Sequence, residues 1–367
     1  MKKFTKFAGL AMASVMMFSM TACVSTGGGT SVGNEDTYVK ESAAVTESSN
    51  ITESTSVSVS LEKTSSSDVA IDENNFPDNV FREYVKTIID KDGNGLLSQQ
   101  EIEGCQKIEF YDEDNQPVLN TSFRMKNMKG IEFFTELRTL SILYNLVTEL
   151  DLSRNTKLEV LDCSTNPIFS LNLSNCPNLK SLAISDDNLT ALDLSHNEEL
   201  EYMQLYRTKL PSLDLSHNRK LISLSLLYGE MTKIDLSANT ELTDLSIGFV
   251  PITGINLKNN KKLQELDISA TDLKKIDLSK NTKLRHLVLE SNKLTTLNVS
   301  HNPLLCWLQL KCNKIKSVNV SSCPELIKVV KKGKRTKNTN EWLLENQKYG
   351  QHILEADKKC KVITKSK

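Results

Sequence analysis

Side chains that carry oxygen atoms recur at alternate positions in a short segment between residues 90 and 101. Taken as a twelve-residue loop, this segment has Gly95 at position 6, where a sharp turn is needed, and Glu101 at position 12, where both carboxylate oxygens can close a metal site. The carbonyl of Leu96 would serve at position 7 and the hydroxyl of Ser98 at the water-bridged position 9. This spacing predicts a bound calcium ion. Its predicted ligands are Asp90, Asp92, Asn94, Leu96, Ser98 and Glu101.

The alternative for this segment is an ordinary surface turn rich in Asp, Asn and Gly. The flanking sequence favours the calcium loop, because apolar residues between Val80 and Ile89 recur at helical spacing after Pro77, and a second helix is expected from Ser98 to Gly104. A second loop with the same spacing is not found in the sequence, whereas calcium sensors normally pair their loops. We therefore expect a structural calcium site that rigidifies the amino-terminal cap.

Leucine recurs every 21 residues from Leu137 to Leu326, which defines nine repeats over residues 137–325. The first half of a repeat follows L-x-x-L-x-L-x-x-N-x-L, and the second half follows apolar, Asp or Asn, apolar, Ser, any residue, Asn. Each apolar side chain contributes roughly 1.5–3 kcal/mol when buried, but a single repeat has nothing to bury it against. The repeats must therefore stack into a curved solenoid of short strands and turns, because a β-sandwich would show turns of variable length.

The repeat pattern resembles the leucine-rich repeat family, specifically its 21-residue bacterial class of two nested half-motifs, and is similar to internalin-J-like surface proteins. The resemblance covers about half of the chain. The calcium-type loop before the repeats is similar to small modules in secreted proteins of gut Firmicutes, and Met128–Phe134 looks like a degenerate first repeat. The resemblance implies a leucine-rich repeat solenoid with parallel strands on its concave face, preceded by an EF-hand-like helix–loop–helix module.

The amino terminus resembles a bacterial lipoprotein signal peptide. Basic residues precede an apolar run from Phe7 to Met20 that is too short to span a membrane, and Ala22 directly precedes Cys23. Lipid attachment is expected at Cys23, although Met20 stands where the family pattern usually has Leu, and the alternative is a plain secretory signal. The Ser-, Thr- and Glu-rich segment that follows has too few apolar residues to fold. We therefore expect a lipid-anchored protein on the extracellular face of a bacterial cell membrane.

These patterns divide the chain into six parts. They are a lipoprotein signal peptide over 1–23, a disordered tether over 24–70, an EF-hand-like helix–loop–helix over 71–104, an amino-terminal cap with a degenerate repeat over 105–136, nine leucine-rich repeats over 137–325, and a basic carboxy-terminal cap over 326–367.

The two halves of the repeat differ in how far their outward positions vary. In the second half, the residue between the two inward apolar residues is always Asp or Asn, which indicates that its side chain bonds the backbone amide two residues on. In the first half the outward positions change freely, as a recognition surface would. We therefore expect the first-half strands to form the concave sheet.

Aromatic residues gather on three consecutive first-half strands, where Thr208, Gly229 and Val250 also replace the inward Asn. Exposed aromatic residues in adjacent repeats are unusual, and departures from a repeat rule tend to gather at functional positions. The alternative is that these rings only pack on each other along a sheet edge. The predicted ligand-binding residues are Tyr202, Tyr206, Arg207, Leu227, Tyr228, Phe249, Glu265, Asp267 and Trp307.

Composition and the remaining motifs favour a binding protein over an enzyme. The net charge of −1 predicts no nucleic-acid partner, and the sequence contains no phosphate loop, metalloprotease motif or nucleophile elbow. The cysteines form no zinc-type cluster, and a Cys306–Cys312 disulfide is an open alternative. The lysines of residues 328–337 are expected to form a solvated cap surface, with an anionic contact such as phospholipid or teichoic acid as the alternative.

We therefore expect a monomeric adhesion protein that recognises a protein or glycan on a host or neighbouring cell surface. The alternatives are a surface protein that captures glycan or peptide nutrients and, more distantly, an accessory subunit of a surface enzyme complex.

Overall fold

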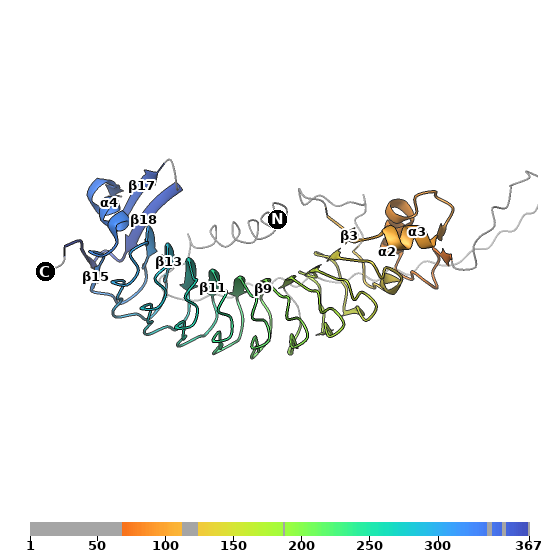
Figure 1. The fold of residues 1–367 in the computed structure, drawn as a ribbon, viewed down its shortest axis with the longest axis horizontal. Coiled ribbons are helices and arrows are strands. Elements are labelled where there is room, and N and C mark those ends of the chain that lie inside the picture. Colours follow the sequence, from red (N-terminus) through yellow and green to blue (C-terminus); the bar gives the residue numbers. More distant parts are fainter. Residues whose placement is uncertain (1–67, 112–123, 186–187, 336–339, 347–349, 366–367) are drawn as a thin grey trace, which may run out of the picture.

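The computed structural model describes residues 68–111, 124–185, 188–335, 340–346 and 350–365, with a small amino-terminal cap, a curved solenoid and a carboxy-terminal cap (Figure 1). The central sheet has 13 strands, and its parallel strands run along the concave side of the solenoid. One strand in this sheet is supplied by each repeat: β4 (Thr139–Ser141), β6 (Val160–Asp162), β8 (Ser181–Ser185), β9 (Tyr202–Tyr206), β10 (Ser223–Leu227), β11 (Asp244–Gly248), β12 (Glu265–Ser269), β13 (His286–Val288) and β14 (Trp307–Gln309).

Successive strands of the repeats pair in register with an offset of 21 residues, as Leu224 with Leu245 shows, and together they form a parallel solenoid. Within each strand the apolar residues point inward, so Leu224 and Leu226 in β10 are buried and the residue between them is only half-buried. The predicted solenoid with first-half strands on the concave face is confirmed.

Second-half strands are shorter, and three are regular: β5 (Glu149–Leu150), β7 (Ser170–Leu171) and β15 (Ser317–Asn319). The Asp or Asn at the outward position accepts a hydrogen bond from the backbone amide two residues on in all nine repeats, for example from Ser237 N to Asp235 Oδ1 at 2.9 Å. The predicted backbone role of these side chains is confirmed.

The asparagine that ends each second half forms a continuous buried ladder. Asn239 Nδ2 donates to the carbonyl of Leu215, 3.0 Å away, and to the carbonyl of Asn218, 2.9 Å away, so one amide group joins two turns. Its Oδ1 has no hydrogen-bond partner, and the same holds for the six other asparagines of this ladder: Asn155, Asn197, Asn218, Asn260, Asn281 and Asn302. In this ladder the side chain therefore acts only as a donor.

This asymmetry explains why cysteine occupies the same position in two repeats. A thiol is a weak donor of about the right size. Cys323 Sγ lies 3.4 Å from the carbonyl oxygen of Asn302, and Cys176 Sγ lies 3.9 Å from that of Asn155. Both cysteines are buried, and burial raises the pKa of Cys176 to about 11.

The amino-terminal cap packs three phenylalanines onto the first turn. The rings of Phe76, Phe81 and Phe134 are fully buried, with the centroids of Phe76 and Phe81 5.6 Å apart. The carbonyls of Ile131 and Phe134, one repeat before Leu152 and Asn155, accept from Asn155 Nδ2 and so extend the ladder. The elements of this cap are β1 (Val69–Ala70), α2 (Asn79–Tyr84), the π-helix η1 (Val85–Ile89), β2 (Leu96–Leu97), α3 (Gln99–Gly104), β3 (Lys107–Glu109) and the 3-10 helix η2 (Ile131–Phe133).

The carboxy-terminal cap corrects one expectation. Its apolar residues Trp342, Leu343, Leu344 and Ile353 suggest a short helix that covers the last repeat, but they lie in two antiparallel strands. One of these strands pairs parallel with β14 and continues the sheet, so the last edge is covered by a strand instead of a helix. The elements here are α4 (Pro324–Lys332), β16 (Lys334–Arg335), β17 (Asn340–Asn346), β18 (Gly350–Ala356) and β19 (Lys361–Ile363).

The donor-only role of the ladder asparagine makes a sharp prediction. Asn239→Cys keeps a donor and should lower the free energy of unfolding by about 1 kcal/mol, whereas Asn239→Asp places a carboxylate against two carbonyls and should cost about 3 kcal/mol or more. Urea denaturation followed by circular dichroism measures both. The control is Asn256→Asp, at an outward position where five repeats already carry Asp, and it should be nearly neutral. Equal losses for Asn239→Cys and Asn239→Asp would contradict the donor-only role.

Candidate functional site

An aromatic cluster lies at the ends of three consecutive concave strands. The rings of Tyr228 and Phe249 are stacked, with centroids 4.4 Å apart and an interplanar angle of 3°, and Tyr206 meets Tyr228 edge to face at 5.2 Å. The Arg207 guanidinium carbon lies 5.2 Å from the Tyr206 ring centroid and 5.6 Å from that of Tyr228. We call Tyr206, Arg207, Tyr228 and Phe249 the rim cluster. Four of the nine predicted ligand-binding residues therefore come together.

Three members of the rim cluster occupy a strained backbone position. Arg207, Tyr228 and Phe249 have φ angles of 53°, 56° and 54°, in the left-handed region that L-residues avoid at a cost of roughly 1–2 kcal/mol each. Hydrogen bonds to the next turn hold this geometry, as from Phe249 N to the Ser269 carbonyl at 3.2 Å. The same position is left-handed along the solenoid, and none of its described occupants is glycine or asparagine.

The turns that carry the rim cluster lack the first-half asparagine ladder. Thr271 in the following turn also replaces the asparagine. In a turn that keeps it, Asn166 Oδ1 accepts from Val147 N at 3.0 Å, and its Nδ2 donates to the Ile142 carbonyl at 2.8 Å. Asn145, Asn292 and Asn313 make equivalent bonds, whereas Thr208, Gly229 and Val250 cannot. The rim cluster therefore lies in turns that lack the stabilising hydrogen bonds of the first-half asparagine ladder.

Five other predicted ligand-binding residues lie apart from the rim cluster. Tyr202 occupies the opposite end of β9 from Tyr206, and Trp307 lies on β14, where its ring is 5.8 Å from that of His286. Leu227 ends β10 directly before Tyr228, and its side chain lies beside Gly248 on the next strand. Glu265 and Asp267 are on β12.

An acidic strip crosses the sheet beside these residues. Burial raises the pKa of Asp267 to about 6 and also raises that of Asp244. Glu265 Oε1 lies 3.3 Å from His286 Nδ1, and this contact lowers the pKa of Glu265. The Cys306 side chain and the Glu265 carboxylate together raise the pKa of His286 to about 9, so the pair carries opposite charges at neutral pH. The contact between His286 and Cys306 is not evident from the repeat pattern, because it joins neighbouring columns on different turns.

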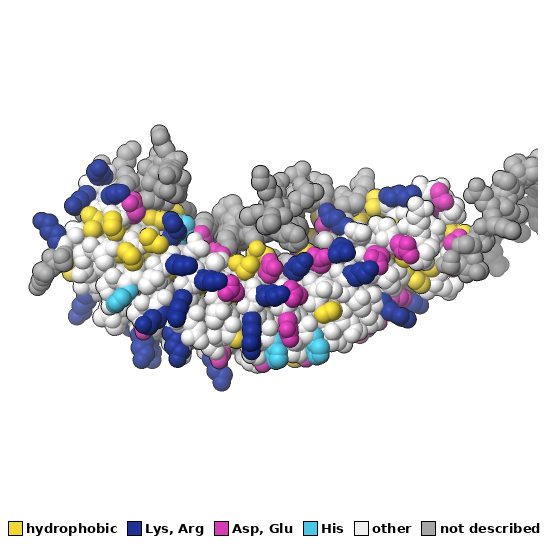
Figure 2. Space-filling view, in the orientation of Figure 1, with side chains coloured by type: hydrophobic (Ala, Val, Ile, Leu, Met, Phe, Trp, Pro, Cys, Tyr) yellow, Lys and Arg dark blue, Asp and Glu magenta, His cyan; other side chains and the backbone are white. Residues whose placement is uncertain are grey.

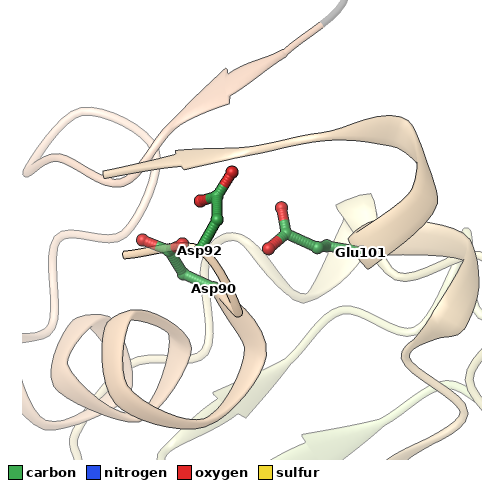
Figure 3. Close-up of side chains that lie close together, drawn as sticks. All are labelled: Asp90, Asp92 and Glu101. Atoms are coloured by element: carbon green, nitrogen blue, oxygen red, sulfur yellow. The ribbon is translucent and has the colours of Figure 1, made fainter. Parts of the chain in front are cut away.

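A second candidate site is the loop between α2 and α3, where three carboxylates converge (Figure 3). Oxygen atoms of Asp90, Asp92 and Glu101 lie within 4.8 Å of one another, and these residues form the metal-capable group found among the described residues. Asp90 is buried, and its two oxygens accept from the backbone amides of Gly93 at 2.8 Å and Gly95 at 3.0 Å. The loop backbone therefore holds the Asp90 carboxylate in place.

Two further loop residues also have a role that needs no ion. Ser98 caps α3 by accepting from Glu101 N, and Glu101 Oε2 accepts from Ser98 N at 2.9 Å, which is a reciprocal capping box. The other carboxylate oxygen of Glu101 accepts from Lys91 N at 2.6 Å, across the loop. The Ser-x-x-Glu spacing of this box is visible in the sequence.

Asn94, like Asp90 and Glu101, uses its side chain in hydrogen bonds within the loop. Its Oδ1 accepts from Leu96 N at 2.7 Å, and its Nδ2 donates to Asp92 at 2.8 Å.

The remaining sequence expectations have a mixed outcome. Cys23 and the tether up to residue 67 lie outside the described residues. The end of the predicted disordered tether is wrong, because Val69–Ala70 form β1 by pairing with Leu96–Leu97. Cys306 is a free thiol, so the Cys306–Cys312 disulfide is not formed. Within the described part of the chain, none of the helices has the length and apolar character needed to cross a membrane.

Solved structures similar to this chain are internalin-like leucine-rich repeat proteins. The functional domain of InlJ from Listeria monocytogenes, described as including a cysteine ladder, is 29% identical over 70% of this chain, with a TM-score of 0.64. The alignment spans 55% of the InlJ domain, about half its length. An internalin, InlF, from Listeria monocytogenes is 23% identical over 67% of this chain and 92% of that protein, with a TM-score of 0.37. The Leptospira interrogans protein LIC12759 is 21% identical over 51% of this chain and 57% of that protein, with a TM-score of 0.45.

No family model and no curated protein matches the chain.

Proposed function

We propose that this protein is a membrane-anchored extracellular adhesion protein that recognises a protein ligand through the concave side of its solenoid. The observation that carries the proposal is the rim cluster, in which Tyr206, Arg207, Tyr228 and Phe249 stack over consecutive turns. Aromatic residues and arginine dominate the energetically important parts of protein interfaces. The turns that carry these side chains also lack the first-half asparagine ladder, which argues that the side chains are not kept for stability.

The packing within the rim cluster favours a protein over a glycan. Sugar rings stack on open aromatic faces, but Tyr228 has Phe249 stacked 4.4 Å away and the Arg207 guanidinium 5.6 Å from its ring centroid. The cluster therefore offers ring edges, hydroxyl groups and a cation more than a flat platform. A glycan or peptide nutrient remains the second candidate, and an accessory role in a surface enzyme complex is a distant third.

The side chains at the repeat position of Phe249 become small in the following turns, and the ligand would pack there. The residues equivalent to Phe249 in the next two turns are Ala270 and Ser291, so this column supplies no large side chain beyond Phe249. Phe249 is 40% exposed, which is high for a phenylalanine. An apolar side chain of the ligand can pack there, and Glu265 and Asp267 on the neighbouring strand would favour a cationic neighbour.

The likeness to the InlJ functional domain supports a surface-binding role for this architecture. Since the alignment spans about half of that domain, the activity and partner of this chain are argued from its own rim cluster.

The rim-cluster proposal predicts a loss of binding in Tyr228→Ala with Phe249→Ala. Removal of two central aromatic residues should weaken the interaction by about 2 kcal/mol or more, which is roughly a 30-fold increase in Kd. The chain itself carries alanine at this left-handed position in Ala270, so the fold should be kept. Surface plasmon resonance against an array of extracellular-matrix proteins, with a glycan array in parallel, measures the effect.

The matched control is Tyr144→Ala. Tyr144 occupies the same repeat position, is 47% exposed and contacts Tyr111 in the amino-terminal cap instead of the rim cluster. Its removal should leave ligand binding unchanged. A ligand whose affinity survives the double variant, or falls equally in the control, would refute this site; a hit on glycans alone would favour nutrient capture.

We also propose that the loop from Asp90 to Glu101 binds one calcium ion that stabilises the amino-terminal cap. The three convergent carboxylates support this proposal, and oxygen ligands at this spacing suit calcium. The strand β2 within the loop pairs with β1, and Ile71 N donates to the Gly95 carbonyl at 3.0 Å. Calcium would therefore hold together the loop and the segment where the tether joins the cap.

Glu101→Gln separates the metal role from the helix-capping role. Glutamine preserves a capping box but removes the charge and bidentate binding that calcium needs. The parent protein should bind one calcium ion with a Kd of about 10⁻⁴–10⁻³ M by calorimetry and melt at a higher temperature in millimolar calcium. Glu101→Gln should lose both effects while Glu103→Gln, on the exposed face of the same helix, keeps them. Absence of heat with the parent protein would rule out the site.

A lipid anchor at Cys23 completes the proposed location. The apolar run before it and the small residue Ala22 support processing as a bacterial lipoprotein. Mass spectrometry of the mature protein from its bacterial membrane fraction should find a lipid-modified Cys23 at the amino terminus. Cys23→Ser should release the protein into the medium or leave the signal peptide uncleaved. An unmodified mature amino terminus in the parent protein would exclude the anchor.

A further inference from the structure

We propose that the carboxy-terminal part of the solenoid and its cap form a second binding surface, separate from the rim cluster, for a linear polyanion that carries phosphate or sulfate groups. Figure 2 shows Lys and Arg side chains gathered over the end of the molecule that carries β13, β15 and α4. On the same face, Asp and Glu side chains gather toward the middle and the other end.

The charge imbalance is large among exposed side chains. Among residues 255–333 and 353–365, whose side chains the structure describes, Asp277 is the one exposed acidic residue. Over the same range 18 basic residues are exposed: Lys258, Lys261, Lys262, Lys274, Lys275, Lys280, Lys283, Arg285, Lys293, Lys314, Lys316, Lys328, Lys331, Lys332, Lys358, Lys359, Lys361 and Lys365.

Earlier turns of the same solenoid provide an internal comparison. Among the described residues of 137–254, eight exposed acidic residues face eight exposed basic ones. The basic ones are Arg138, Arg154, Lys157, Arg207, Lys209, Arg219, Lys220 and Lys233. The strand register, the second-half asparagine ladder and the outward Asp or Asn bonds recur in both parts, so the fold itself does not require the lysines. Their accumulation needs another reason.

The acidic residues that this half does contain are largely engaged. Lys293 pairs with Asp272, and Lys328 pairs with Glu325 at 2.6 Å. Lys311 pairs with the buried Glu355. By contrast, Lys261, Lys275 and Lys280 make no ion pair with the described residues. Positive charge therefore remains uncompensated, and self-repulsion of such a surface destabilises the folded state until a counter-charge binds.

The distribution of these lysines favours a polymer over a small anion. They recur on turns that stack about 4.8 Å apart, occupy several positions around each turn and continue onto α4 and the last strands. A small anion needs a few converging donors, whereas a polymer gains from many separate contacts and from release of its counterions. Because the charges lie around the turn and not in one plane, a flexible chain can reach more of them than a flat membrane can.

Two triple variants with matched repeat positions test the proposal. Lys261→Glu, Lys275→Glu and Lys280→Glu change the basic half; Arg219→Glu, Lys233→Glu and Arg154→Glu change the equivalent positions two, two and six repeats earlier. The net charge falls by the same amount in both variants. The probes are fluorescent heparin, fluorescent polyphosphate and phosphatidylglycerol vesicles, with anisotropy or sedimentation measured from low to high salt.

The parent protein should bind heparin, polyphosphate or both, with affinity that falls steeply as salt rises. The basic-half variant should bind about tenfold more weakly or worse with a shallower salt dependence, and the matched variant should lose far less. The polymer should also raise the melting temperature of the parent protein. Binding to vesicles alone, equal losses in the two variants, or no binding at low salt would each overturn the proposal. None of these results depends on the rim cluster, whose residues are intact in the basic-half variant.

Discussion

Each turn of the solenoid has to reverse the chain in the interior, where backbone carbonyls cannot reach water. The buried asparagine of the second half resolves this problem, because its amide group donates to one carbonyl 24 residues back and another 21 residues back. An unpaired buried carbonyl would be costly, so the spacing between these two acceptors constrains every repeat to the same length. The strict period and the in-register strands follow from this donor, which a cysteine thiol supplies in the two repeats that carry Cys176 and Cys323.

The ladder holds the backbone of each turn. The outward positions of the two half-repeats therefore differ in how strongly the fold constrains their side chains. Second-half outward positions keep Asp or Asn, since each closes a local turn with the amide two residues on. First-half positions have no such duty, and there the chain carries serine, aspartate, tyrosine or tryptophan without a change in strand geometry. The left-handed residue at the end of each concave strand is held by backbone bonds to the next turn. It therefore accepts side chains as different as Ala270 and Phe249.

Most of this arrangement could be predicted from the sequence, because periodicity reports directly on burial and on backbone bonding. The concave strands, the backbone role of Asp235 and its equivalents, and the proximity of Tyr206, Tyr228 and Phe249 all follow from repeat position. The carboxy-terminal cap could not be predicted in this way. Its apolar residues belong to no repeat. Strand β18 forms by pairing with the otherwise unpaired edge of β14, and this pairing depends on tertiary structure instead of local sequence. The contact between His286 and Cys306 was missed for a similar reason, since it joins different columns.

The loop from Asp90 to Glu101 shows how one residue can satisfy two patterns at once. Glu101 closes a capping box with Ser98 and also lies within 4.8 Å of two other carboxylates. Helix capping explains the spacing of Ser98 and Glu101, but it gives no reason for a buried Asp90 and an adjacent Asp92 to point at the same place. Like charges held this close repel one another unless a cation or a network of amide donors compensates. Amide donors from Gly93 and Gly95 serve Asp90, and those from Lys91 and Ser98 serve Glu101. Backbone amides of the loop thus stabilise its negative charge, and under the calcium proposal this arrangement would lower the reorganisation that binding requires.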